Sequence, residues 1–97
     1  MKNEDKQVIL NVSKELHTLV ETSYLNNKAV KGDDNWLEKQ RLLLADMALH
    51  LLQTSINPNP INIEHLKNNL NAILTISDQF MPEIGLKKFT DKLYEHV

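Results

Sequence analysis

The chain has 97 residues and no cysteine, and its 11 basic and 13 acidic side chains give a formal net charge of −2. This length corresponds to one domain, which we place at residues 1–97. Without cysteine, the chain cannot form a disulfide, a thiolate metal site or a cysteine nucleophile. A single arginine among balanced charges also argues against nucleic-acid recognition, so no nucleic-acid partner is expected.

The sequence carries no pattern of a secreted or membrane-spanning protein. Residues 1–6 are polar and mixed in charge, unlike the start of a secretory signal. The densest apolar stretch, Leu42–Leu52, contains Asp46 and His50 and is shorter than the roughly 20 residues that cross a bilayer. We therefore predict a cytoplasmic protein.

Apolar spacing predicts a first helix from about Glu4 to Leu25. The side chains expected on its inner face are Val8 or Ile9, Val12, Leu16, Leu19, Val20 and Tyr24. The polar segment Asn26–Asn35 predicts a long loop containing Gly32. Candidate N-caps for the next helix are Asp33, Asp34 and Asn35.

A second helix is predicted from about Asp34 to Thr54, with the richest apolar stripe of the chain, so we expect it to be the most buried helix. Its inward residues are predicted to be Trp36, Leu37, Leu44, Met47, Ala48 and Leu51, widened by Leu42, Leu43, Ala45 and Leu52. Pro58 and Pro60 bias the residues before them away from the helical region and end this helix.

Asn62 is placed to cap a third helix that continues to about Gln79. Its apolar residues recur in alternating steps of three and four that skip only Ser77, the pattern of a helix packed among other helices. The seam consists of Ile63, Leu66, Leu70, Ile73 and Phe80.

Pro82 breaks the chain after the third helix and could open a fourth helix. Gly85 weakens a helix start at this point, so the regular part of the fourth helix is predicted from Leu86. Predicted inward residues are Phe89, Leu93 and Val97, and predicted outward residues are Lys87, Lys88, Asp91, Lys92 and Glu95. Short connections between the later helices favour an all-α antiparallel up-down four-helix bundle.

Two pairs of side chains have spacing suited to metal ligands: His17 with Glu21, and Asp46 with His50. Each pair lies on one helix, and the chain lacks the Glu-x-x-His motif of diiron bundles, so no metal site is predicted. Asp46 interrupts the apolar stretch and needs a partner, either Arg41 or a donor on a neighbouring helix. The four serines carry no nucleophile motif, and no cofactor-binding loop is present, so we predict no catalytic residue, no cofactor and no enzymatic activity.

The end of the chain offers the best candidate surface for a partner. Three lysines and three apolar or aromatic side chains alternate there, namely Lys87, Lys88, Phe89, Lys92, Leu93 and Tyr94. Such a pattern is typical of the solvated face of an amphipathic helix. It also suits contact with a protein partner or proximity to an anionic membrane surface.

In length, helix spacing and hydrophobic register, the chain resembles the immunity proteins of class IIa (pediocin-like) bacteriocins, in particular the enterocin A immunity type. The segments that carry the resemblance are Val12–Val20, Trp36–Leu37, Leu44–Leu49 and Ile63–Ile76. The Asn57–Pro60 turn is not part of it.

The resemblance implies a protein that protects a bacteriocin producer from its own toxin. Proteins of this family work from the cytoplasmic side by binding a toxin-bound membrane receptor, the mannose phosphotransferase permease. Their C-terminal half contributes to specificity, which here corresponds to Ile61–Val97. The alternative function is a regulatory or phage-encoded helical protein that binds a partner without catalysis.

Overall fold

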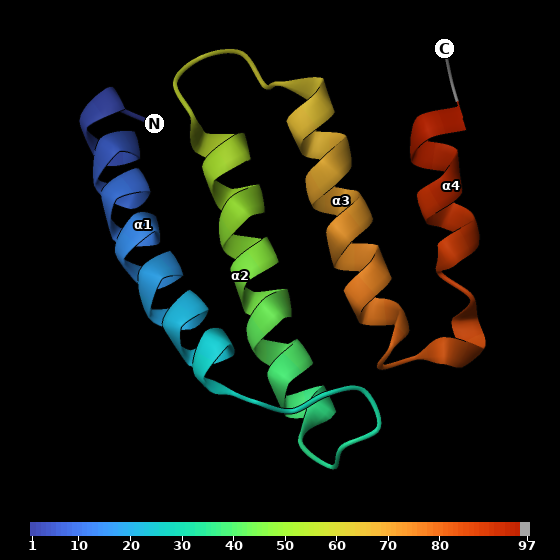
Figure 1. Cartoon of the computed structure of the whole chain (residues 1–97). Helices are drawn as coiled ribbons and strands as arrows, with labels where there is room; N and C mark the ends of the chain where they lie inside the picture. The colour runs from blue at the N-terminus through green and yellow to red at the C-terminus, as the bar shows by residue number, and fades with distance from the viewer. Residues whose placement is uncertain (96–97) are drawn as a thin grey trace.

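The chain is all-helical, as a computed structural model that describes residues 1–95 shows (Figure 1). Over these residues it contains α1 (Asn3–Asn26), α2 (Trp36–Ile56), α3 (Ile63–Asp78) and α4 (Lys87–Glu95), with one short 3-10 helix, η1 (Pro82–Ile84), before α4. The helices run alternately up and down, which confirms the prediction of an antiparallel four-helix bundle. Within residues 1–95, no helix combines the length and the apolar character needed to cross a membrane.

The bundle is open, because its helices lie side by side in one layer in the order of the sequence (Figure 1). α1 packs on α2, α2 on α3, and α3 on α4, while α1 and α4 lie at opposite edges of the layer. The molecule measures 45 × 37 × 16 Å. Its radius of gyration is 15.2 Å, compared with about 12.5 Å expected for a compact domain of this length.

The helix boundaries follow local chemistry that the sequence reveals. Asn62 caps α3 as predicted, since its side-chain oxygen accepts a hydrogen bond from the His65 amide at 3.0 Å. Asn35 occupies the N-cap position of α2 without a capping hydrogen bond from its side chain. Gly85 adopts φ +68° between η1 and α4, in the left-handed region that favours glycine. The regular part of the fourth helix therefore begins one residue after Leu86.

The predicted inner face of α1 is partly wrong, since only Ile9, Val20 and Tyr24 of its members are half-buried. The apolar side chains Val8, Val12, Leu16 and Leu19 are exposed. Leu10 and Ser13 are buried instead, and Ser13 is only 1% exposed. The reason is that α1 lies at the edge of the layer, so a single neighbour covers a single face of this helix. That face is the one that carries Leu10, Ser13 and His17.

The predicted inward stripes of α2 and α3 are also partly wrong, because each helix has neighbours on two sides. In α2 the buried residues are Gln40 and Asp46, whereas Leu37 and Ala48 are exposed. In α3 the buried residue is Ile76. The predicted seam residues Ile63 and Phe80 are exposed, and Leu66, Leu70 and Ile73 are half-buried.

In α4, the predicted inward residue Phe89 is exposed, because this short helix docks on α3 through a different stripe. Leu86 and Thr90 are buried and Leu93 is half-buried. Val97 lies outside the described residues. The prediction that Lys87, Lys88, Asp91, Lys92 and Glu95 face outward is confirmed.

Polar side chains bridge the central helices. The indole Nε1 of Trp36 donates to Gln79 Oε1 at 2.8 Å, and Gln79 Nε2 donates to Gln40 Oε1 at 2.9 Å. Gln40 is 3% exposed, so this relay satisfies a buried amide. Among the described residues, no buried side-chain nitrogen or oxygen lacks a hydrogen-bond partner.

Candidate functional site

A histidine and aspartate cluster joins α1 to α2. His17 projects from α1 and its Nδ1 hydrogen-bonds Asp46 Oδ1 on α2. The other ring nitrogen of His17 lies 2.9 Å from Glu21 on the same helix. His50, one turn beyond Asp46, places its Nε2 3.5 Å from Asp46 Oδ2. Of the two partners expected for Asp46, the donor on a neighbouring helix is the one that the structure supplies.

The two imidazole rings of the cluster lie edge to face, with their centroids 5.0 Å apart. Asp46 is nearly buried between them, with 11% of its side chain exposed. Arg41, the other candidate partner, instead pairs with Glu38 at 2.9 Å on the surface. An almost buried carboxylate is thus satisfied by two histidines, as burial of a polar group requires.

Among the described residues, the side chains of this cluster are of the types that could hold a metal ion. One ligand atom each from His17, Asp46 and His50 can be chosen so that all three lie within 4.8 Å of one another. Two imidazoles and a carboxylate are ligands that zinc accepts. The two predicted pairs lie on different helices, and the fold brings them together across the helix interface.

The arrangement does not assemble a nucleophile at Ser13, although Ser13, His17 and Asp46 would supply the residue types of a catalytic triad. The Ser13 hydroxyl donates to the Leu10 carbonyl at 2.8 Å. The ring nitrogen of His17 that would serve as its base points to Glu21 instead. A base within hydrogen-bond reach of the hydroxyl, which activation requires, is therefore lacking in this geometry.

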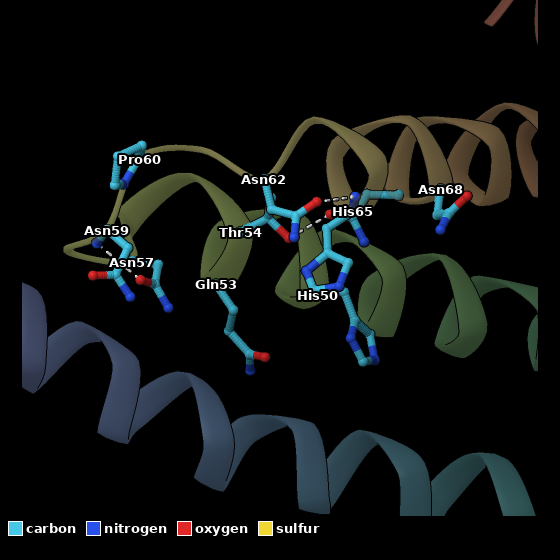
Figure 2. Close-up of a pocket in the computed structure, with 10 residues that line it drawn as sticks. His50, Gln53, Thr54, Asn57, Asn59, Pro60, Asn62, His65 and Asn68 are labelled. Atoms are coloured by element: carbon cyan, nitrogen blue, oxygen red, sulfur yellow. Dashed lines mark hydrogen bonds between the residues drawn. The ribbon is translucent and has the colours of Figure 1, made fainter. Parts of the chain in front are cut away.

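A polar cleft of about 600 Å³ lies where the end of α2 meets the start of α3 (Figure 2). Its wall consists of amide, imidazole and hydroxyl side chains with one proline. They are His50, Gln53, Thr54, Asn57, Asn59, Pro60, Asn62, His65, Asn68 and Asn69. His50 belongs to both the cleft and the cluster, so the two features are continuous.

Several amides of the cleft are used to hold its own backbone. Asn57 accepts from the Asn59 amide at 3.0 Å and so closes the turn before α3 (Figure 2). Thr54 on α2 donates to Asn69 on α3 and ties the two walls together. The lining residues of the cleft include no carboxylate, lysine or arginine. This cleft was not predicted from the sequence, although the density of asparagine, glutamine and histidine between residues 50 and 69 was a signal.

The residues predicted to bind a partner lie on α4, away from the cluster, and one of them, Tyr94, contacts Asn68 at the border of the cleft. Lys87, Lys88 and Lys92 are exposed, and so are Phe89 and Tyr94, whereas Leu93 is half-buried. The Tyr94 hydroxyl donates to Asn68 Oδ1 of α3 at 2.7 Å, which fixes this ring against the layer. Lys88 places its ammonium 5.9 Å from the centroid of the Phe89 ring.

No protein-family model, no curated protein and no solved structure matches this chain.

Proposed function

We propose that this chain is a bacteriocin immunity protein that protects its host cell by binding, without catalysis. The chain places four antiparallel helices in 97 residues, the architecture that its resemblance to the class IIa immunity proteins implies. The proposed partner is a membrane receptor with bound bacteriocin, of the mannose phosphotransferase permease type. The proposed location is the cytoplasmic side of the membrane.

The observation that carries the binding function is the position of α4 at an edge of the layer. This helix rests on α3, and it presents three lysines beside two aromatic rings. Lysines at the rim of an interface mainly accelerate encounter with an anionic, membrane-proximal partner. An aromatic side chain that becomes buried on binding determines how long the complex lasts.

The proposal is tested by expressing the chain in bacteria that are sensitive to pediocin-like peptides and challenging them with a panel of these peptides. We expect resistance to at least one peptide. Exchange of the segment after Ile61 for that of a related immunity protein should change which peptide is tolerated. Soluble, folded expression without resistance to any member of the panel would contradict the proposal.

A second candidate function is a regulatory or phage-encoded protein that binds a different partner. The polar cleft between α2 and α3 favours it, because the immunity proposal gives this surface no role. The two functions differ in genomic context, since an immunity gene is expected next to the gene of a short peptide with a double-glycine leader.

A further inference from the structure

The apolar side chains of α1 lie on a broad side of the layer, not between helices. Successive residues of a helix turn by about 100°. The members of the exposed row on α1 therefore lie between about 100° and 180° around the helix from His17, which faces α2. Its members are Val8, Val12, Leu16 and Leu19.

The same side continues on α2. Asp46 faces α1 and Gln40 faces α3, and the remaining arc of α2 carries an exposed row formed by Leu37, Ala45 and Ala48. A shallow apolar groove of about 460 Å³ runs along this arc and reaches Phe80 after α3.

On α3 and α4 the two sides of the layer can be told apart. The half-buried Leu66, Leu70 and Ile73 lie half a turn from Asn68. Tyr94 bonds Asn68 and so marks the polar side, while Phe89 lies on the other flank of α4. Each helix is right-handed and runs opposite to its neighbour. The apolar rows of all four helices therefore project from the same broad side of the layer. We call this side the apolar face.

The exposed area of the chain exceeds that of a compact monomer. Its accessible surface is 6999 Å², whereas a folded monomer of 11.2 kDa is expected to expose about 5,700 Å². The excess is about 1,300 Å². If two copies covered this area on each other, they would bury about 2,600 Å², within the range of obligate homodimers.

The charge of the apolar face fits a second copy as its occupant. Two identical chains, each of net charge −2, gain nothing from electrostatic attraction and so need a contact surface without charge. Arg41 is the charged residue that lines the apolar groove, and it is already paired with Glu38.

We infer that a second copy of this chain packs on the apolar face, so that two layers form a symmetric sandwich of eight helices. Such an isologous contact needs one self-complementary patch, which the apolar face provides. The polar side, with the histidine and aspartate cluster and the cleft, remains accessible in this dimer. The inference does not rest on the proposed immunity function, but the dimer would cover Phe89, which that function places at the partner surface of α4.

Sedimentation velocity and light scattering over a concentration series test the dimer. We expect about twice the 11.2 kDa mass of the chain. Leu16→Glu combined with Ala48→Glu places four charges in the interface and should reduce the mass to that of the monomer. The matched control, Thr18→Glu combined with Thr75→Glu, changes exposed residues of the polar side and should leave the dimer intact.

A second experiment measures how strongly the apolar face is covered, and it uses variants that are not designed to disrupt the dimer. Because the chain has no cysteine, Ala48→Cys and Thr75→Cys each provide a single thiol for maleimide labelling. Dimerisation should slow labelling at position 48, increasingly so at higher concentration, and leave position 75 unchanged. A monomer at all concentrations would overturn the inference, as would a dimer that is insensitive to the apolar-face changes. A monomer with position 48 protected would also overturn it and indicate closure of the layer within one chain.

Discussion

His17 on α1 hydrogen-bonds Asp46 on α2, 29 residues further along the chain. This contact sits at the centre of an interface where Leu10 and Ser13 are the buried residues contributed by α1. The interface therefore includes a polar pair, and removal of this pair should be costly.

Replacement of Asp46 by alanine should lower the free energy of unfolding by about 1 to 3 kcal/mol, because His17 loses its hydrogen-bond partner and His50 loses a nearby carboxylate close to the interior. Urea denaturation followed by circular dichroism measures the change. Glu38→Ala is the control on the same helix. Its carboxylate is exposed and paired only with Arg41, so a loss of about 0.5 kcal/mol or less is expected.

The coupling between the two side chains can be measured directly. The double variant His17→Ala with Asp46→Ala should cost less than the sum of the two single variants, because each single change already removes the same contact. Strict additivity would show that the pair is not an energetic unit.

Stability should not depend on a bound metal. The Asp46 carboxylate is engaged by both histidines, and His17 also pairs with Glu21, so the cluster satisfies its own polar atoms. We expect equal melting temperatures with and without a chelator, and well below one metal ion per chain in elemental analysis. One zinc ion per purified chain would contradict this expectation.

Two isoleucines of α3 provide a matched test of the core. Ile76 is 6% exposed and Ile63 is 57% exposed. Ile76→Ala should cost about 2 to 5 kcal/mol through lost burial and the cavity that remains. Ile63→Ala should cost less than about 1 kcal/mol, and Leu70→Ala should fall between the two. Equal losses at Ile63 and Ile76, measured by thermal melting, would refute the assignment of the α3 faces.

Gln79 connects Trp36 to Gln40, and its loss should be visible in fluorescence. Gln79→Ala removes the acceptor of the indole and the donor to a buried amide. We expect a loss of about 1 to 3 kcal/mol. Trp36 is the single tryptophan of the chain, so its emission spectrum reports this site alone. An unchanged spectrum together with unchanged stability would exclude a role for the relay.

Reversal of the charge on α4 should weaken partner binding and leave the stability of the fold unchanged. The triple variant of Lys87, Lys88 and Lys92 to glutamate changes exposed side chains, so melting and helicity should stay nearly constant. Protection of sensitive cells should weaken, because the rim no longer attracts an anionic partner. Full protection by this variant would move the partner site away from α4.

The helix boundaries could be read from the sequence because they depend on local chemistry. The cap at Asn62 and the proline-rich turn after Ile56 act within a few residues of their own position. The side of each helix that becomes covered depends instead on how many neighbours the helix has. For α1, the apolar row through Val12 and Leu16 suggested the wrong side.

The covered row of α1 nevertheless has the regular steps of a helix seam. Leu10, Ser13, His17, Val20 and Tyr24 follow one another at alternating intervals of three and four residues, and all five are buried or half-buried. Apolar spacing does not predict this row, because Ser13 and His17 are polar. The cluster at Asp46 could not be predicted either, since it requires the register between two helices.

The packing of each helix against its neighbours in sequence has a consequence for cooperativity. α4 can detach from α3 while the contacts of α1 with α2 remain intact. The chain then resembles a short repeat array, in which stability propagates from unit to neighbouring unit. Amide hydrogen exchange should accordingly be slowest in the two central helices and fastest in α4, which has nine residues and one neighbouring helix. If this edge opens before the rest of the layer, α4 can change its position without unfolding of the other three helices.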